Sequence, residues 1–411
     1  MSEHYDPLET RSSDAREAVL AEALPRQVAH ARAHAPYFAA TFAELDPAAI
    51  TSLAALARLP VLRKSALLAR QAEAPPFGGV VATPLADLAR VYASPGPLYE
   101  PEGETRDYWR FARALFATGL RRGDLLHNCF AYHFTPAGMM LESGARALGC
   151  PVFPGGTGNT EMQARAAAQL HPRCYSGTPD FLKAILEAGN ALGLDLSSLR
   201  LGHVTGGAYL PALREWYLAR GLTVLQSYGT AELGLVAYES EAREGLILDE
   251  GVIVEIVRPG TGDPVPDGEV GEVVVTTLNP HHPLIRFATG DLSAILPGAS
   301  PCGRTNRRIR GWMGRADQAT KVRGMFVRPE QVAAILREVP TVHRARLVVS
   351  LDGDRDAMTL RAECADASVA PALEAALQSA TRLRGAVEIV LPGSLPNDGR
   401  VIEDTRPVPP A

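Results

Sequence analysis

Between residues 105 and 227 the sequence alternates helical segments with short apolar runs, and this alternation limits the possible folds more than any other feature. Short apolar runs bounded by turn residues predict buried strands. Strands that alternate with helices favour a layered α/β domain with a largely parallel sheet. We expect helices near 105–119, 137–148, 160–170 and 179–192, and strands near 125–129, 151–153, 201–205 and 224–227.

After residue 245 the pattern changes from mixed to β-rich. Residues 246–257 and 271–277 have the composition of strands, and the turn residues of Pro259–Pro264 separate them. This pattern predicts a β-rich subdomain at about residues 245–310. Together with the preceding strands and helices it forms one large N-terminal domain, residues 1–316.

Beyond Asp317 the chain predicts a small module of its own. Helical patterns at 329–337 and 370–383 alternate with strand patterns at 344–350 and 357–363. The predicted fold class is therefore α/β, with a large N-terminal domain of several subdomains and a small α+β C-terminal domain, residues 317–411.

The composition excludes several classes of protein. Hydrophobic residues make up 46% of the 411 positions, and the net charge of −5 argues against a general nucleic-acid binder. Five cysteines without CxxC spacing favour a reducing compartment. The acidic N-terminus lacks the apolar core of a signal peptide, and no apolar run is long enough to span a bilayer. We expect a soluble, cytoplasmic protein without membrane contact.

Four short motifs follow one another in a fixed order: Ser227–Glu232 (Ser-Tyr-Gly-Thr-Ala-Glu), Thr289–Leu292 (Thr-Gly-Asp-Leu), Gly314–Asp317 (Gly-Arg-Ala-Asp) and Lys321–Gly324 (Lys-Val-Arg-Gly). This series resembles the adenylate-forming superfamily, and most closely its phenylacetate-CoA ligase branch, over almost the whole chain. The family converts a carboxylic acid into an acyl-AMP and then into a thioester. The resemblance implies a site built from these motifs.

In the family, the turn that here contains Tyr228, Gly229, Thr230 and Glu232 stacks an aromatic ring near the adenine. Its acid binds the magnesium that accompanies the ATP phosphates. A carboxylate suits this role because Mg²⁺ prefers oxygen ligands. The resemblance therefore gives Glu232 a catalytic role and places its neighbours in the nucleotide pocket. A tight turn after a strand is the simpler alternative for this motif alone.

Two further segments resemble parts of the same pocket. Asp291 matches an aspartate that accepts hydrogen bonds from both ribose hydroxyls, and Arg315 matches a basic residue near the ribose or phosphate. Gly206, Gly207 and Ala208 resemble a glycine-rich turn that lines the adenine and acyl pockets. Without side chains, such a turn lets a flat ring approach the backbone. An ordinary Gly-Asp turn is the alternative explanation at Asp291.

The resemblance also implies a moving C-terminal domain. Asp317 matches the hinge about which that domain pivots between the two half-reactions. Lys321 matches a lysine that faces the active site in the thioester-forming orientation, and it is one of only three lysines, with Lys64 and Lys183. Either Lys321 is catalytic, or it is a solvated strand residue. A GC-rich genome would explain the scarcity of lysine by itself.

The chain departs from the family at the two places that handle ATP. The family's phosphate loop, Ser-Ser-Gly-Thr-Thr-Gly-Lys-Pro, aligns with a proline-rich stretch that retains Ser94 and Gly96 but has Glu100 in place of a cation. Prolines remove amide donors, and an acid at this position is expected to repel a polyanion. Near the C-terminus no lysine remains in the segment Leu395–Ile402, and Arg400 aligns with either the adenylation lysine or a later arginine of the family; as a replacement for the lysine, its planar group is a poor substitute.

An aromatic segment after the first strand resembles the acyl pocket of the branch. Phe130, Tyr132 and Phe134 would contact a flat aryl acid, and His133 would act as a general base toward a thiol or hydrogen-bond the substrate. Ordinary core packing of Phe130 and Phe134 is the alternative. His203 is a weaker candidate for the same region.

The family's cysteine-rich zinc segment is reduced here to one thiol. Cys302 remains, and Ser300 and Ser240 stand where further cysteines are expected. One thiol cannot build a four-ligand site, so we expect no structural zinc and no other bound metal beyond magnesium with ATP.

These departures suggest an acyltransferase on a ligase fold, with adenylation impaired. It would move an aryl acyl group from acyl-CoA, or from an adenylate made elsewhere, to the thiol of CoA or of an acyl carrier protein's phosphopantetheine. Such a step would suit the biosynthesis of an aryl-primed natural product. Basic residues at 304, 307, 308 and 310 would meet the carrier or CoA, unless they are merely a solvated loop.

Two alternatives remain open. The chain is an ATP-dependent aryl-CoA ligase that uses ATP and magnesium with other phosphate ligands, or it is a non-catalytic protein that binds an acyl or nucleotide ligand. A homodimer is compatible with the sequence. The sequence does not identify the acyl group.

Overall fold

The computed structural model describes residues 3–94, 98–316, 318, 320–323, 325–352 and 355–406. The chain divides into two compact units. The first unit consists of Met1–Val254, Val275–Phe287 and Leu296–Gly311, and the second consists of Glu255–Val274, Ala288–Ile295 and Trp312–Ala411. The predicted boundary at Asp317 stays a prediction, because that residue lies outside the described ones.

The first unit is built on a mixed sheet with the strand order β14-β15-β10-β9-β8-β7-β6-β4-β5. From β5 to β8 the neighbouring strands are parallel, and from β8 to β15 they are antiparallel. The parallel part contains the apolar runs of residues 105–227, so the predicted layered α/β domain is confirmed. Its strands are β4 (Leu126–Asn128), β5 (Val152–Pro154), β6 (Cys174–Gly177), β7 (Leu201–Val204), β8 (Thr223–Thr230), β9 (Gly234–Glu239), β10 (Leu246–Leu248), β14 (Ile295–Leu296) and β15 (Arg308–Ile309).

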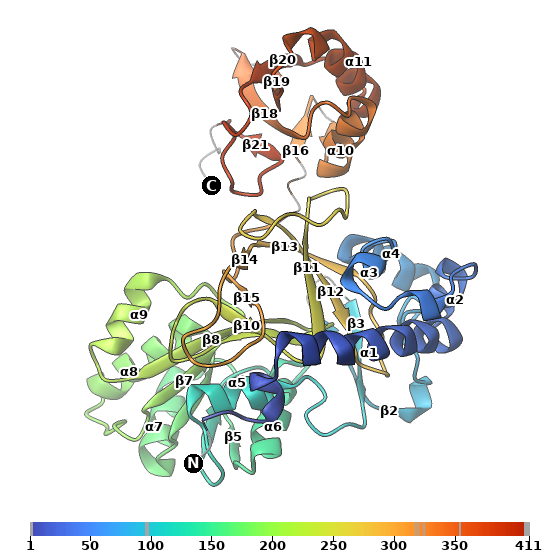
Figure 1. Ribbon diagram of the computed structural model, residues 1–411. Coiled ribbons are helices and arrows are strands. Elements are labelled where there is room, and N and C mark those ends of the chain that lie inside the picture. The colour runs from blue at the N-terminus through green and yellow to red at the C-terminus, as the bar shows by residue number, and fades with distance from the viewer. Residues whose placement is uncertain are drawn as a thin grey trace. The chain divides into compact units, whose positions relative to one another are not determined.

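Helices cover both faces of this sheet (Figure 1). Cys174 packs into a cluster with side chains of α5 and α6, whereas the next residue, Tyr175, packs into a cluster with α7, α8 and α9. Because successive strand residues point to opposite faces, both faces are buried. The helices are α5 (Phe111–Thr118), α6 (Ala137–Leu148), α7 (Thr160–Leu170), α8 (Pro179–Ala191) and α9 (Pro211–Leu218).

The N-terminal part of the first unit is mostly helical and ends in an antiparallel pair of strands, β2 and β3. The segment is important because it supplies residues on which the candidate site depends. Its elements are η1 (Pro7–Thr10), α1 (Ser13–His34), α2 (Pro36–Thr41), η2 (Pro47–Ala49), α3 (Leu53–Leu56), β1 (Leu62–Arg63), α4 (Lys64–Glu73), η3 (Leu85–Asp87), β2 (Leu88–Ser94) and β3 (Leu98–Gly103).

The β-rich region predicted after residue 245 is present. Its strands β11 (Val252–Val257), β12 (Gly271–Thr277) and β13 (Phe287–Ser293) form a sheet with the order β1-β13-β12-β11. The predicted strand 246–257 is two strands, β10 and β11. Asp249 separates them, because its carboxylate accepts the Gly251 N–H at 2.9 Å and so stabilises a local turn.

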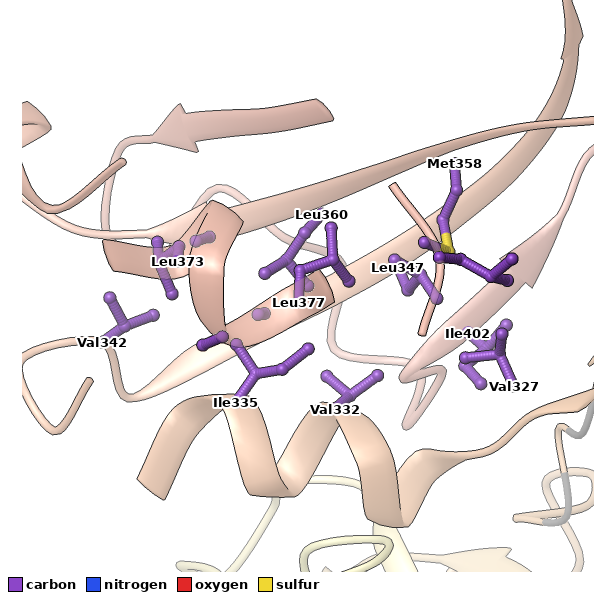
Figure 2. Close-up of a cluster of buried hydrophobic side chains, with 14 of the residues drawn as sticks. Val327, Val332, Ile335, Val342, Leu347, Met358, Leu360, Leu373, Leu377 and Ile402 are labelled. Carbon is purple, nitrogen blue, oxygen red and sulfur yellow. The ribbon is translucent and has the colours of Figure 1, made fainter. Parts of the chain in front are cut away.

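The C-terminal module of the second unit has its own core, which confirms the predicted α+β module (Figure 2). Val332 and Ile335 from one helix and Leu373 and Leu377 from the other pack against the sheet β20-β19-β18-β21. The elements are β16 (Thr320–Val322), β17 (Met325–Val327), α10 (Pro329–Glu338), β18 (Arg344–Asp352), β19 (Arg355–Glu363), η4 (Ala367–Val369), α11 (Ala370–Thr381), β20 (Ala386–Val390) and β21 (Ile402–Asp404). Within the described residues, no helix is long and apolar enough to cross a membrane.

Candidate active site

Glu100 lies in β3, opposite Tyr92 of β2, and its environment differs from the one expected from the sequence. The residue is only 1% exposed, and the hydroxyl of Ser94 donates a hydrogen bond of 2.5 Å to its Oε1. Burial raises the pKa of Glu100 to about 8, against the opposing hydrogen bond from Ser94 and with a further increase from Glu232. Near pH 7 the carboxyl is therefore mostly neutral.

This result corrects the expectation that Glu100 repels ATP. A neutral carboxylic acid carries no charge to oppose a phosphate, so the electrostatic argument against ATP binding loses its basis. Gly96, the glycine of the altered loop, lies outside the described residues.

Lys64 forms an ion pair with Glu232 directly beside this region. The Nζ of Lys64 lies 2.7 Å from Oε1 of Glu232, whose side chain has no exposed surface. Apart from this ion pair, neither carboxylate oxygen of Glu232 has a hydrogen-bond donor among the described residues. Both Glu232 and Lys64 act on the pKa of Glu100, in opposite directions, so the three side chains form one electrostatic cluster.

Backbone contacts position this cluster. The amide of Leu62 in β1 donates to the carbonyl of Arg286 at 3.0 Å, and the guanidinium of Arg286 donates to the carbonyl of Leu59 at 2.6 Å. On α4, the side-chain amide of Gln71 exchanges two hydrogen bonds with the backbone of Tyr99, at 2.8 and 2.9 Å. These contacts fix the start of α4, where Lys64 lies, and the strand that carries Glu100.

His282 is a second buried group near Glu232. Burial lowers its pKa to about 4, although the charge of Glu232 opposes the change. Its Nε2 has no hydrogen-bond partner among the described residues. The imidazole is therefore neutral near pH 7 and adds no charge to the cluster. The sequence analysis assigned neither His282 nor Lys64 to the site. The rarity of lysine in the chain was the one feature that could have indicated Lys64.

The turn after β8 has the form that its sequence predicts. The hydroxyl of Thr230 accepts the N–H of Leu233 at 3.2 Å, which closes the turn that contains Glu232. A side chain at Gly229 would meet the carbonyl oxygen of Gly234 at 2.6 Å, so this close pairing with β9 requires glycine. Tyr228 is buried, with only 9% of its surface exposed.

The predicted acyl pocket is brought together only in part. Phe130 is buried, and its ring lies 3.7 Å from the position of a Cβ on Gly206, whose φ of +70° favours glycine. Gly207 and Ala208 follow in the same exposed turn. Phe130 and this turn are thus neighbours, as the resemblance implied.

Other aromatic residues of that segment lie differently. Phe134 is 77% exposed and does not belong to the buried cluster that contains Phe130, so ordinary core packing does not explain Phe134, and its contact with an aryl acid stays a prediction. His133 is exposed as well. The hydroxyl of Tyr132 accepts a hydrogen bond of 2.8 Å from Asn128.

His203 lies in the protein interior, between neighbouring strands of the sheet. It is buried between Ser227, whose hydroxyl lies 3.0 Å from Nε2, and Ser176 at 3.5 Å from Nδ1. Burial lowers its pKa to about 3, so the ring is neutral near pH 7. These contacts join β6, β7 and β8, and do not support a role as a base.

In the second unit, the side chains of Arg315 and Trp312 contact the carboxylate of Asp291. Nη1 of Arg315 lies 2.8 Å from its Oδ1, and Nε1 of Trp312 donates to the same oxygen at 3.1 Å. The backbone amide of Asp291 donates to the hydroxyl of Thr289 at 3.1 Å. Asp291 and Arg315, both predicted from the resemblance, are thus direct partners.

Two predicted residues of the second unit give no structural evidence. Asp317, the predicted hinge, lies outside the described residues. The backbone of Lys321 pairs with Phe326 between β16 and β17, but its side chain is not among the described ones. Arg400 is exposed, and its amide donates to Asp398 at 3.0 Å.

The former zinc segment is held by hydrogen bonds and ion pairs. Burial raises the pKa of the Cys302 thiol, but hydrogen bonds from Ser240, Ser300 and Arg304 outweigh it and the net pKa falls below its ordinary value. Arg304 is 2% exposed and pairs with Glu9 at 3.2 Å. Among the described residues, no group of three or more His, Cys, Asp or Glu side chains is arranged to hold a metal ion.

Arg308 is also buried, and it donates to the carbonyl of Glu244 at 2.8 Å. The prediction that Arg304 and Arg308 meet a carrier protein or CoA is therefore wrong, because neither guanidinium is available at the surface. Arg307 and Arg310 are exposed.

Comparisons with known proteins agree with this architecture. The sequence profile of the AMP-binding enzyme family matches residues 107–279. Phenylacetate-coenzyme A ligases of Thermus thermophilus and Escherichia coli are 34% and 31% identical to the chain, over 88% and 92% of its length and 84% and 89% of theirs. A solved 2-hydroxyisobutyryl-CoA ligase in complex with 2-HIB-AMP and CoA matches with a TM-score of 0.74 and 25% identity, over 96% of this chain and 92% of that one.

Proposed function

Because the chain belongs to the phenylacetate-coenzyme A ligase family of adenylate-forming enzymes, we propose that it is an AMP-forming ligase that joins an aryl acid to coenzyme A. In the first step the carboxylate of the acid attacks the α-phosphorus of ATP, and acyl-AMP and pyrophosphate form. In the second step the thiol of CoA attacks the acyl carbonyl, the thioester forms and AMP leaves.

The burial of Glu100 is the observation that favours this function over an acyltransferase. The case for impaired adenylation depended on a negative charge in the phosphate loop. Since the carboxyl is 1% exposed, accepts a hydrogen bond from Ser94 and has a pKa of about 8, that charge is largely absent near pH 7.

The residues fit the reactants of a ligase. Glu232 would hold magnesium, since its buried carboxylate has no hydrogen-bond donor among the described residues apart from the Lys64 ion pair. Magnesium would neutralise part of the phosphate charge. Asp291 would accept the ribose hydroxyls beside Arg315, and Tyr228 would contact the adenine.

The acyl group would lie against Phe130 and the Gly206 turn, which are neighbours in the structure. A flat ring suits this surface because Gly206 presents no side chain. Lys321 and a hinge at Asp317 would serve the thioester-forming step.

An acyltransferase that uses acyl-CoA and an acyl carrier protein is the second candidate. The absence of lysine from the segment Leu395–Ile402 favours it, since adenylation in the family uses a lysine there. Arg400 retains the positive charge at this segment, with a planar group of different reach.

Aryl-acid-dependent exchange of labelled pyrophosphate into ATP tests the proposal. The acids would include phenylacetate, benzoate and anthranilate, and CoA thioester formation would be measured with each acid that supports exchange. Exchange with at least one acid, followed by thioester formation, is the expected result.

No exchange with any acid would contradict the ligase. Transfer of an acyl group from aryl-CoA to a holo-carrier protein would then support the second candidate. If neither reaction occurs while ATP or an aryl acid still binds, the protein is a non-catalytic binder.

A further inference from the structure

The altered phosphate loop raises the question of which cation meets the phosphates of ATP in the first unit. The loop has no lysine, since the only lysines are Lys64, Lys183 and Lys321. Lys183 pairs with Glu187 on the surface of α8, and its Nζ lies 5.4 Å from the ring centroid of Trp216. Of these two lysines in the first unit, only Lys64 is next to Glu232.

The side chain of Lys64 is paired with Glu232 and is also partly exposed to solvent. Its Nζ lies 2.7 Å from Oε1 of the wholly buried Glu232, yet 35% of its own side chain is exposed. An ammonium group has three N–H donors, so one contact with Glu232 leaves donors for another oxygen ligand. The group is therefore positioned by Glu232 and still open to a ligand.

The start of α4 strengthens the attraction for an anion. Lys64 is the first residue of this ten-residue helix, and no side chain caps the helix at Arg63. The positive end of a helix dipole disfavours cations and favours anions, so the ammonium of Lys64 at this end is costly without a negative partner. Glu232 supplies one negative partner, and a phosphate would supply another.

The surroundings of Lys64 do not oppose a phosphate. Glu100 is buried, with its Oε1 bonded to Ser94, and is mostly neutral near pH 7. His282, near Glu232, is also neutral at that pH. The cluster of Lys64, Glu100 and Glu232 thus holds one positive and one negative charge, and a phosphate is not repelled by a second acid.

We propose that Lys64 binds the triphosphate of ATP and so replaces the lysine that the phosphate loop has lost. Glu232 orients the ammonium in the free protein. This inference rests on the proposed ligase function and adds a residue that the motif series does not contain. Because the ammonium reaches the site from α4, the contact does not depend on the altered loop.

Binding of ATP and of AMP to Lys64→Met, measured by calorimetry, tests the proposal directly. We expect the Kd of MgATP to rise at least tenfold and that of AMP to change by less than about threefold, since AMP lacks the β- and γ-phosphates. Lys64→Arg should recover most of the affinity, because it retains the charge. Lys183→Met is the matched control and should bind both nucleotides like the wild type.

A second pair of variants separates binding from folding, because Lys64→Met leaves Glu232 buried without its partner. The double variant Lys64→Met/Glu232→Gln has neither charge, and in Glu232→Gln the ammonium that loses its partner is partly exposed rather than buried. In EDTA, where magnesium is absent, the double variant should bind ATP at least tenfold more weakly than Glu232→Gln. Equal affinities in this pair would overturn the proposal and leave Lys64 as a structural partner of Glu232.

The outcome is distinguishable from failure of the ligase function. If the wild type supports pyrophosphate exchange and Lys64→Met does so with an unchanged KM for ATP, the ligase stands and the role of Lys64 is wrong. If the wild type binds ATP but supports no exchange, the ligase function is wrong, and the binding experiments still decide the role of Lys64.

Discussion

Glu232 in the first unit and Asp291 in the second are both shielded carboxylates paired with a more exposed cation, but their hydrogen bonding differs. Asp291 receives two hydrogen bonds at one oxygen, from Arg315 and Trp312. Glu232 has the ion pair with Lys64 and no hydrogen-bond donor among the described residues. Its side chain is also wholly buried, whereas that of Asp291 is 13% exposed.

This difference shows two ways to prepare a carboxylate for a ligand. Asp291 is oriented by neutral and charged donors, so its position does not depend on one partner. Glu232 depends on a single ammonium for its charge balance, and a buried acid without donors is costly unless another cation or a polar ligand joins it. We therefore expect the first unit to respond more strongly than the second to loss of the cation.

Of the two ion pairs, Lys64–Glu232 should lose more stability when its cation is removed, as in Lys64→Met. Removing one partner of a buried ion pair leaves an uncompensated charge, so we expect the free energy of unfolding to fall by about 3 kcal/mol. This value is at the low end for buried pairs because Lys64 is partly exposed. Urea denaturation measures it. A second substitution, Glu232→Gln, should restore most of the loss. A single variant as stable as the wild type would show that the pair contributes little.

A substitution at the other carboxylate should act on the nucleotide rather than on the fold. Asp291→Asn retains the shape of the side chain but replaces one of the two carboxylate oxygens that would accept hydrogen bonds from the ribose hydroxyls. We therefore expect the rate of pyrophosphate exchange at low ATP to fall by about 10- to 100-fold. Trp312→Phe is the matched control, since it removes one donor to Asp291 and leaves the carboxylate in place. An unchanged KM for ATP in Asp291→Asn would exclude the ribose contact.

Local sequence was sufficient to predict the family and the α/β fold. Thr230, Gly229 and Asp291 lie in tight turns after or within strands, where each side chain's position follows from a few neighbouring residues. Short-range hydrogen bonds of this kind are encoded in the motif itself. Asp291 and Arg315 belong to two consecutive motifs of the series, and their side chains are in direct contact.

The burial of Glu100 and the partner of Lys64 could not be predicted in this way. Glu100 was interpreted as an exposed charge because a sequence gives no exposure, and its neutral state depends on packing against distant segments. Lys64 contacts Glu232 only because Gln71 fixes α4 to Tyr99 of β3 and Arg286 fixes the chain before α4. The exposure of Phe134 could not be predicted for the same reason, since a sequence does not give the orientation of a side chain.

The charge state of Glu100 makes the stability of the first unit depend on pH. The pKa of Glu100 is 4.5 in the unfolded chain and about 8 in the folded protein, so between these values only the folded protein keeps the proton. The free energy of unfolding is therefore highest below pH 4.5 and falls as the pH rises to about 8. Relative to the wild type, Glu100→Gln should gain up to about 1.4 kcal/mol per pH unit across this window. Urea denaturation at several pH values measures the difference, with the exposed Glu104→Gln as control. Parallel curves for Glu100→Gln and the wild type would show that Glu100 ionises normally.

The smallest effect should come from Arg315→Ala, the counterpart of Lys64→Met in the second unit. The Arg315 side chain is 51% exposed, and Asp291 keeps the hydrogen bond from Trp312, so the carboxylate is not left without a partner. A solvent-screened ion pair contributes about 0.2–1 kcal/mol to the free energy of unfolding. Urea denaturation of Arg315→Ala beside Lys64→Met compares the two pairs under one condition. Equal losses in the two variants would mean that the hydrogen bonds to Asp291 do not replace a cation, and that the two carboxylates depend on their cations to the same extent.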